Sequence, residues 1–387
     1  MSGPQHHDAI VIGAGIVGAA CAEALARDGL RVLVLERAYA ACGTTAAGMG
    51  HLVAMDDSPA QLALTAYSAR LWTALRGDLP RAVEMEECGT LWVAEDDAQL
   101  EAVRAKARVY ATAGVRADVL GPGELFAAEP HLRRDLVGAL RVPGDGVLYP
   151  PAAALHLLDR ARALGASVRE GSAVTAIGGH SVRCGAEVLR ADVIVNAAGA
   201  QAPALTPGLP IIPRKGHLVI TDRHPGFCRH QIVELGYLAS AHVMTNESVA
   251  FNVQPRATGQ VLIGSSRELA GWDAAINPRI VRRMLERARH FMPRIGTLSA
   301  LRTWTGFRPA TPDKLPLIGP WEPTAGLWIA AGHEGLGITT SLGSAQIIAD
   351  LVTGREPAVS AAPFAPTRVL ATAASEHAPL AAASGSR

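Results

Sequence analysis

Three glycines near the start of the sequence have the spacing of a nucleotide-binding turn. Gly13, Gly15 and Gly18 follow a short apolar run at 9–12 and precede an alanine-rich stretch at 19–27, an order that predicts strand, tight turn and helix. Gly13 permits the turn, Gly15 lets the backbone approach a pyrophosphate, and Gly18 lets the helix pack close to the strand. The N-terminus of the helix then directs unpaired N–H groups and the positive end of its dipole toward the phosphates.

A carboxylate follows at the expected distance. An apolar run at 31–35 predicts a second strand, and Glu36 lies at its end, where a carboxylate can accept hydrogen bonds from both ribose hydroxyls. An arginine there would instead suit a 2′-phosphate, so the adenosine half is that of FAD or NAD. Strand, glycine loop, helix, strand and glutamate in this order predict a dinucleotide site without choosing between a flavin and a nicotinamide.

Three further segments favour a flavin. A loop of small residues at 43–51 stands where a nicotinamide domain would normally continue with another βα unit, and a strand with a small-residue turn at 195–200 can lie against the dinucleotide. The segment 332–340 supplies a second helix N-terminus, whose dipole can raise the potential of a ring that becomes anionic on reduction. An NAD-dependent dehydrogenase is the alternative that this last segment disfavours.

The elements that position these residues alternate along 387 residues, enough for two lobes that share one site, and 49% hydrophobic and 18% charged residues indicate a large core. The glycine-turn segments predict a parallel sheet and the middle strands a separate antiparallel lobe. Helices are predicted at 61–76, 95–110, 151–164, 278–291 and 341–353, and strands at 167–177, 191–197, 216–221, 249–254, 261–264 and 326–331.

Composition also excludes several classes of protein. The 36 basic and 35 acidic residues give a net charge of +1, without a basic stripe that would follow a nucleic acid. The five cysteines are odd in number and scattered, so neither a disulfide framework nor a zinc site is suggested, no metal is expected, and a reducing, cytoplasmic location fits best. The first apolar run ends after about five residues, too short for export or for a transmembrane segment, and none is predicted elsewhere.

The chain resembles the FAD-dependent amine oxidoreductases of the D-amino acid oxidase superfamily, in the branch of glycine oxidases and bacterial D-amino acid dehydrogenases. The phrases GMGHLV and CGTLWV are most similar to D-hydroxyproline dehydrogenases. The resemblance covers about residues 8–366 and rests on IVIGAGIVGAACAEALARDGLRVLVLER, TTAAGMGH, VIVNAAGA, RTWTGFRPATPDKLPLIG and AAGHEGLGITTS.

The resemblance implies an α/β fold with a Rossmann-like FAD-binding domain of the glutathione reductase type and a second, antiparallel-sheet α+β substrate domain. We expect the FAD-binding domain at 1–78, 145–206 and 314–366, the substrate domain at 79–144 and 207–313, and a flexible tail at 367–387. No cysteine follows the GFRP motif and the early-loop histidine is out of register with the covalent relatives, so noncovalent FAD is expected.

The cofactor contacts of the family, together with the glycine positions above, fall on residues from six segments of the chain. They are Gly13, Gly15, Ile16, Val17, Gly18, Glu36, Arg37, Thr44, Thr45, Gly48, Met49, Val174, Gly199, His333, Glu334, Gly335, Leu336, Gly337, Ile338 and Thr339.

On the substrate side, Arg308 occupies the place of the family's carboxylate-binding arginine. A guanidinium offers two parallel N–H donors that bind a carboxylate bidentately and fix which face of Cα meets the flavin, although such an arginine can also pair a surface acid. Met49 and His51 are expected near the ring: Met49 to pack on it, and His51 to bind substrate or accept a proton. Arg308 and His51 are therefore the candidate catalytic residues, without a triad or a carboxylate pair.

The expected reaction is hydride transfer from Cα of a small amino or imino acid to flavin N5, with orientation as the main contribution of the protein. D-hydroxyproline, D-proline or another D-amino acid are the leading substrates, and glycine or sarcosine the alternative. Leu262 stands where sarcosine oxidases place an oxygen-activating lysine, which favours a dehydrogenase. The electron acceptor is O2, a quinone or a partner protein, and the chain could form a homo- or hetero-oligomer, including a flavoprotein subunit of a heteromeric dehydrogenase.

Overall fold

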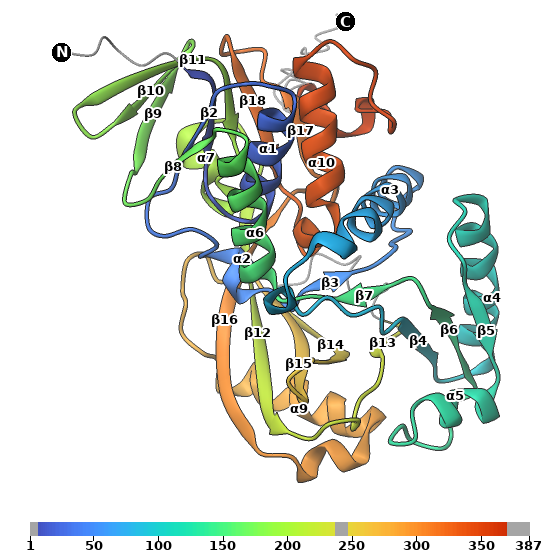
Figure 1. The fold of residues 1–387 in the computed structure, drawn as a ribbon. Coiled ribbons are helices and arrows are strands. Elements are labelled where there is room, and N and C mark those ends of the chain that lie inside the picture. Colours follow the sequence, from blue (N-terminus) through green and yellow to red (C-terminus); the bar gives the residue numbers. More distant parts are fainter. Residues whose placement is uncertain (1–6, 237–246, 370–387) are drawn as a thin grey trace, which may run out of the picture.

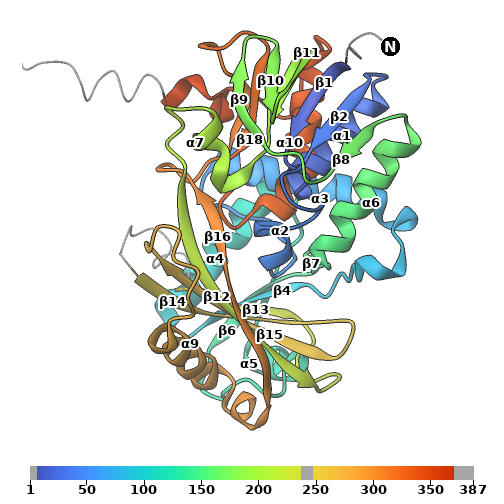
Figure 2. The ribbon, with the colours of Figure 1, turned by 90° about the vertical axis from the view of Figure 1, so that its left-hand side faces the viewer.

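The computed structural model describes residues 7–236 and 247–369 of the chain. In this part of the chain the strands form two eight-stranded sheets and one two-stranded sheet. Figures 1 and 2 show the first large sheet and its helices in the upper part of the molecule and the second large sheet in the lower part. The predicted α/β class, a Rossmann-like sheet with a second, largely antiparallel sheet, is confirmed.

The first sheet has the order β17-β18-β11-β1-β2-β8. Its inner strands pair in parallel, and β17 runs antiparallel at the edge. Strands β9 and β10 continue from β11 as an antiparallel hairpin. The strand bounds are β1 (His7–Ile12), β2 (Val32–Leu35), β8 (Ser167–Arg169), β9 (Val174–Gly178), β10 (Ser181–Cys184), β11 (Glu187–Asn196), β17 (Leu317–Pro320) and β18 (Leu327–Ala331).

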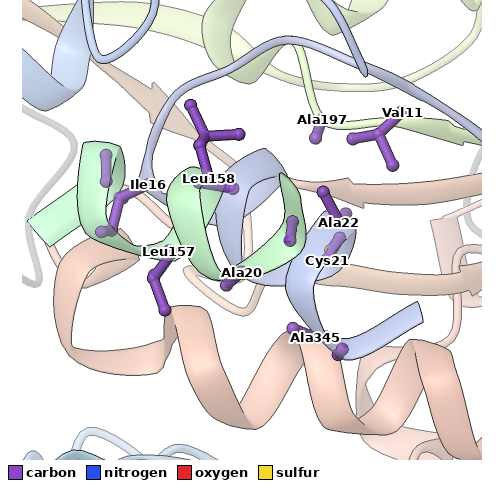
Figure 3. Packing of buried hydrophobic residues seen from close by; sticks show 14 of the residues in the cluster. Val11, Ile16, Ala20, Cys21, Ala22, Leu157, Leu158, Ala197 and Ala345 are labelled. Atoms are coloured by element: carbon purple, nitrogen blue, oxygen red, sulfur yellow. The ribbon is translucent and has the colours of Figure 1, made fainter. Parts of the chain in front are cut away.

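Helix α1 (Ile16–Arg27) lies between α6 (Pro150–Ala163) and α10 (Gly337–Val352) on one face of this sheet. Its sequence is rich in alanine, and small side chains let neighbouring helices approach closely, so the helix is buried along most of its length. Figure 3 shows Ala20 and Ala22 of α1 among larger side chains such as Leu157 of α6. The dinucleotide turn is thereby held in a rigid setting.

The second sheet has the order β16-β12-β15-β14-β13-β4-β6-β5, in which only β13 and β4 pair in parallel. Helix α9 packs on β14 and β15, and helix α4 on β4 and β6. The bounds are β4 (Thr90–Ala94), β5 (Asp118–Leu120), β6 (Gly138–Val142), β12 (Ile212–Arg223), β13 (Gln231–Glu234), β14 (Glu247–Pro255), β15 (Gln260–Glu268), β16 (Ala300–Ala310), α4 (Asp97–Thr112), α5 (Pro122–Ala128) and α9 (Pro278–Phe291).

Short elements lie between the two sheets in both views (Figures 1 and 2). Strand β3 (His51–Leu52) pairs with β7 (Gly146–Val147), so the loop after the dinucleotide motif joins a segment that returns from the second sheet. The remaining helices are α2 (Thr44–Ala47), α3 (Pro59–Leu75), α7 (Ala202–Leu205) and the 3₁₀ turns η1 (Arg76–Asp78), η2 (Arg81–Val83), η3 (Gly199–Gln201), η4 (Pro293–Thr297) and η5 (Ala362–Phe364).

Most predicted elements lie within a few residues of the observed ones. The helix predicted at 95–110 starts at Asp97 because the Asp96 carboxylate accepts a hydrogen bond from the Gln99 N–H (2.8 Å) and caps the helix there. The stretch predicted as strand at 167–177 is two strands, β8 and β9, with a bend between them. The strands that were not predicted are β3, β4, β5, β6, β7, β10, β13, β16 and β17.

All strands of the first sheet fall inside the segments predicted for the FAD-binding domain, and those of the second inside the segments predicted for the substrate domain. We propose the two-domain division on this basis. Of the predicted tail, residues 370–387 lie outside the described residues. Arg368 bonds the carboxylate of Asp313 and the carbonyl of Leu315, so the docked chain extends past Pro366. Among the helices of the described ranges, none is long and apolar enough to cross a membrane.

Candidate active site

The turn between β1 and α1 is packed so closely that only glycine fits at two of its positions. A Cβ atom on Gly18 would lie 1.9 Å from the carbonyl oxygen of Gly13, and one on Gly13 would lie 2.8 Å from the carbonyl oxygen of Ala197. Helix α1 follows at once, with Gly15 as an N-cap that has no capping side chain. The N-terminus of a helix without a side-chain cap is suited to bind phosphate.

Glu36 ends β2 as a buried carboxylate. Its Oε2 atom accepts a hydrogen bond from the N–H of Ala14 (2.9 Å) and its Oε1 atom accepts one from the N–H of Ala38 (2.9 Å). These bonds fix the carboxylate beside the turn, where the adenosine ribose is expected, while Arg37 is exposed. Val174 lies on β9, partly buried against the apolar cluster that contains Leu35.

The segment after β2 contacts helix α1 and the second sheet through two threonines. The Thr45 hydroxyl accepts a hydrogen bond from the N–H of Ile16 (2.9 Å), at the first turn of α1. The Thr44 hydroxyl donates to the carbonyl of Phe307 (2.7 Å) on β16. This loop therefore links the predicted phosphate site to the strand that carries Arg308.

The second glycine turn, residues 332–337, meets the first one. A Cβ atom on Gly337 would lie 3.8 Å from Cγ2 of Val17, and one on Gly48 would lie 2.9 Å from Cδ1 of Ile338. The Thr339 hydroxyl donates to the carbonyl of His51 (2.9 Å). Segments more than 280 residues apart in the sequence, such as the two that this last bond joins across a separation of 288, thus lie side by side.

Two charged or titratable residues of this turn hold it in place. His333 is buried and its Nε2 atom shares a hydrogen bond with the Ser344 hydroxyl (3.0 Å) on α10, and burial lowers its pKa to about 3, so the ring is neutral. Glu334 pairs with Arg214 (3.1 Å) on β12 and Arg267 (3.4 Å) on β15. Burial alone would raise the pKa of Glu334, but the positive charges of Arg267, Arg214 and Arg308 lower it below the ordinary value.

Gly199 and Leu336 complete the predicted cofactor set. Gly199 begins the turn after β11 with a positive φ of 56°, and a Cβ atom there would have no heavy-atom neighbour within 4 Å among the described residues. Leu336 is the N-cap of α10 and offers no capping side chain.

Arg308 lies where the second sheet meets the second glycine turn. Its Nη1 atom donates a hydrogen bond to the carbonyl of Ser266 (2.9 Å). A Cβ atom on Gly335 would lie 3.8 Å from its Cδ and Nε atoms. The guanidinium lies over Gly216, where a Cβ atom would lie 2.2 Å from Nη1. The absence of a side chain at Gly216 therefore creates the space that the guanidinium occupies.

One face of the second sheet, which we call the platform, carries Arg308 and faces the loop that contains Met49. Residues paired across neighbouring strands share a face, and the pairs Gly216 with Gly306, Asn252 with Gly264 and Gln254 with Leu262 define it. The platform consists of Trp304, Gly306 and Arg308 of β16, Gly216, Leu218 and Ile220 of β12, Leu262 and Gly264 of β15, and Asn252 and Gln254 of β14.

The predicted substrate-side residues Met49 and His51 lie against this platform. Met49 forms an apolar cluster with Leu218 and Leu262. Burial, together with the charge of Arg308, lowers the pKa of His51 to about 4, although the nearby Gln254 side chain opposes part of the shift. His51 is therefore neutral at pH 7, and its Nε2 atom is buried without a hydrogen-bond partner among the described residues.

These residues fit an extended dinucleotide with a flat ring at one end. Glu36 and the first turn can hold an adenosine and a pyrophosphate. The turn at 332–337, Met49 and Arg308 can surround the ring at the opposite end. There His51 and Gln254 each have a buried polar atom without a hydrogen-bond partner among the described residues. The five described cysteines are free thiols, and the described residues contain no cluster of acids, histidines and cysteines that could hold a metal.

Some residues of the site were not predicted. Gln254, Gly216, and the arginine partners of Glu334 became visible only through strand pairing. The one signal available for Gly216 was its place inside a predicted strand, since a glycine there often marks a close approach of another group.

Comparisons with known proteins agree with this geometry. A family model described as FAD dependent oxidoreductase matches residues 8–351. The chain is 34% identical over 328 residues to a D-amino acid dehydrogenase of Methylobacterium sp. (strain 4-46), covering 79% of this chain and 73% of that protein. It is 28% identical over 383 residues to a glycine oxidase of Geobacillus kaustophilus (strain HTA426), covering 94% of this chain and 97% of that protein.

Solved structures show the same fold. The crystal structure of glycine oxidase from Geobacillus kaustophilus matches with a TM-score of 0.84 and 28% identity, covering 94% of this chain and 99% of that one. That of L-proline dehydrogenase from P. horikoshii matches with a TM-score of 0.87 over 95% of this chain and 99% of that one. At 22% identity, the second match bears on the fold alone.

Proposed function

The chain belongs to the family of FAD-dependent oxidoreductases, and we propose that it oxidises the carbon–nitrogen bond of a small amino or imino acid bound through its carboxylate to Arg308. FAD is the cofactor of this enzyme, and the predicted resemblance to the D-amino acid oxidase superfamily is confirmed. The substrate and the role of each site residue are parts of the proposal.

The observation that carries the proposal is the position of Arg308. Its guanidinium lies over Gly216 on the platform and beside Gly335 in the turn that precedes α10. A carboxylate bound bidentately there would place Cα of a short substrate between the platform and that turn. A long side chain would meet the apolar cluster of Met49, Leu218 and Leu262, which favours a small substrate.

Each side chain then has a separate task. Bound FAD supplies the hydride acceptor for the Cα–H bond. Arg308 orients the substrate, and orientation is the largest contribution that such a reaction asks of the protein. Met49, Leu218 and Leu262 exclude water from the reacting face. His51, which is neutral at pH 7, can share a hydrogen bond with the substrate through Nε2.

For the substrate we propose D-hydroxyproline, D-proline or another D-amino acid, with glycine and sarcosine as the alternative. The similarity to a D-amino acid dehydrogenase and to a glycine oxidase supports both groups. The test is an anaerobic screen of the yellow, FAD-loaded protein with these compounds and with their L-enantiomers, following loss of the visible flavin absorbance. Bleaching by a D-amino or imino acid supports the proposal, and a flavin that none of them reduces rejects it.

The electron acceptor is the second open part of the function, and we propose a quinone or a partner protein rather than O2. Leu262 supports this, because it is buried in the apolar cluster where related sarcosine oxidases place an oxygen-activating lysine. The test compares the rates at which O2 and a soluble quinone reoxidise the reduced flavin. Faster reoxidation by O2 would contradict the proposal. Full turnover of the isolated chain with the quinone would show that no partner subunit is required.

For location we propose the cytoplasm. The five cysteines are free thiols, two of them fully or nearly fully buried, as expected for a protein of a reducing compartment. Fractionation of the native host with an antibody against the chain tests this.

A further inference from the structure

Gln254 is a fully buried side chain on the platform whose orientation is fixed by the backbone. Its Nε2 atom donates a hydrogen bond to the carbonyl of Met49 (2.7 Å). Because a carbonyl only accepts, the amide NH2 must face Met49, and this leaves Oε1 as the atom on the other side. The side chain is 0% exposed, so Oε1 is a hydrogen-bond acceptor held rigidly in the protein interior.

This acceptor has no hydrogen-bond partner in residues 7–236 and 247–369. Buried polar atoms in native proteins are nearly always paired, and one left unpaired in a site points to a missing ligand. The Nε2 atom of His51, which lies close to Gln254, is in the same condition. Two neutral polar atoms, one on the platform and one on β3 beside it, are therefore available, and the charge of Arg308 acts on His51.

The charges around this point do not favour a cation. Arg308 of β16 belongs to the platform, and Arg302 lies at the other end of the same strand. Arg214, which pairs with Arg308, and Arg267 both bind Glu334 in the turn before α10. Among the described residues, the carboxylate that pairs with these arginines is Glu334, which is bonded to Arg214 and Arg267, and the neutral His51 adds no charge. An ammonium group placed here would meet positive charge, which stabilises the uncharged amine relative to it.

We infer that Oε1 of Gln254 accepts a hydrogen bond from the amine N–H of the substrate and thereby positions the nitrogen, while the neighbouring arginine charges favour the uncharged amine, the form whose nitrogen lone pair can assist loss of the Cα hydride. The inference rests on the proposed function, because it assumes an amino or imino acid held by Arg308. It assigns Gln254 as a specificity-determining residue that distinguishes a substrate N–H from an isosteric group without a donor.

A pair of unreactive ligands tests the inference without turnover. Pyrrole-2-carboxylate and furan-2-carboxylate have the same shape and carboxylate, but only the first has a ring N–H. Binding of each to the FAD-loaded enzyme is followed by the perturbation of the flavin spectrum. We expect the pyrrole to bind about two- to tenfold tighter, the range for one neutral hydrogen bond. In Gln254→Met the two ligands should bind equally.

The chain offers a matched control for this substitution. Gln61 of α3 is also a buried glutamine, and it lies outside the second sheet. Gln61→Met should therefore keep the preference for pyrrole. Equal binding of the two ligands by the wild type, or loss of the preference in both variants, would overturn the inference.

The pH profile of the reaction gives the second readout. Gln254→Glu places a carboxylate beside the amine, which stabilises the ammonium form, so the rising limb of kcat against pH should move upward by about one pH unit or more. An unchanged limb in a folded, FAD-loaded variant would contradict the inference. If the wild type oxidises an amino acid but shows neither the pyrrole preference nor the shifted pH profile on substitution, only the inference about Gln254 is wrong. If no amino or imino acid reduces the flavin of the wild type, the proposed function itself is wrong.

Discussion

At the scale of single residues, the site depends on the geometry of one guanidinium. Replacing Arg308 by lysine keeps the positive charge but removes the planar pair of donors that a carboxylate can bind bidentately. We expect Arg308→Lys to lose about 1.5–3 kcal/mol of transition-state binding, which is roughly a 10- to 150-fold fall in kcat/KM. Steady-state kinetics measure this, and the FAD content should stay that of the wild type. Unchanged kinetics would mean that Arg308 is a structural arginine.

The residue beneath Arg308 offers an independent prediction. A methyl group on Gly216 would lie 2.2 Å from Nη1 and 2.8 Å from Cζ of Arg308, so the guanidinium must move. A shift of about 1 Å in a substrate-positioning group can cost on the order of 100-fold in rate, and we expect Gly216→Ala to lower kcat/KM by that order. Gly123→Ala in α5 is the control, because a Cβ atom there meets no described heavy atom within 4 Å. Equal activities of the two variants would contradict this account.

At the scale of elements, the turn between β18 and α10 joins the two large sheets through Glu334. This residue has a positive φ of 45°, a conformation that is unfavourable for any residue with a side chain. Glycine would relieve the strain but would lose the carboxylate that binds Arg214 and Arg267. The turn is further attached by a hydrogen bond from the N–H of Glu334 to the carbonyl of Pro309 (2.9 Å), next to Arg308. The cofactor turn and the substrate arginine are therefore held together.

Replacing Glu334 by glutamine keeps the shape of the side chain and removes its charge. We expect Glu334→Gln to lower Tm by a few degrees, which corresponds to about 1–3 kcal/mol, and to weaken FAD retention. Because the pKa of Glu334 is lowered in the folded protein, its contribution is present above the ordinary pKa of a glutamate and is lost as the pH falls through the lowered value. Thermal unfolding against pH measures this, with the exposed Glu322→Gln as control. A deficit in Tm that is equal at acid and neutral pH would contradict the electrostatic explanation.

The elements also show how far the sequence could predict the molecule. The turn at Gly13 to Gly18 was predictable because its backbone geometry excludes side chains at fixed positions. Gln254 was not, because nothing local distinguishes a strand glutamine that faces a site from one in the core. Its position is decided by the pairing of β14 with β15 and by a hydrogen bond to Met49, a residue 205 positions away. Strand pairing over such distances leaves no periodic signal in the sequence.

At the scale of the whole molecule, the chain crosses from the second sheet back to the first near Asp145. This residue lies between β6 of the second sheet and β7, which pairs with β3. Its Oδ1 atom accepts a hydrogen bond from the N–H of Ala54 (2.9 Å), in the segment between β3 and α3. Its Oδ2 atom is buried and has no hydrogen-bond partner in the portion of the chain that the structure describes. A charged carboxylate at this crossing is therefore poorly solvated.

Burial raises the pKa of Asp145 from 3.8 to about 7, although the Thr90 hydroxyl and the N–H of Ala54 oppose part of the shift. The folded protein thus keeps this proton over a range in which the unfolded chain releases it. The contribution of Asp145 to stability is therefore complete below about pH 4, and it falls by up to about 1.4 kcal/mol per pH unit until about pH 7. Asparagine carries no titrating proton, keeps an oxygen for the N–H of Ala54 and adds an N–H that Thr90 can accept.

Asp145→Asn should therefore have the same Tm as the wild type at about pH 4 and a higher Tm at about pH 8, where the wild type has lost the stability that the protonated Asp145 contributes. Thermal unfolding of the FAD-loaded proteins across this range measures the difference, and a variant at the exposed Asp159, Asp159→Asn, should show no such trend. A Tm difference that does not grow with pH would mean that Asp145 is ionised in the folded protein. Since Ala54 follows His51 by three residues, the same titration should loosen the loop that carries the substrate-side residues, and FAD should dissociate from the wild type more readily at about pH 8 than from the variant.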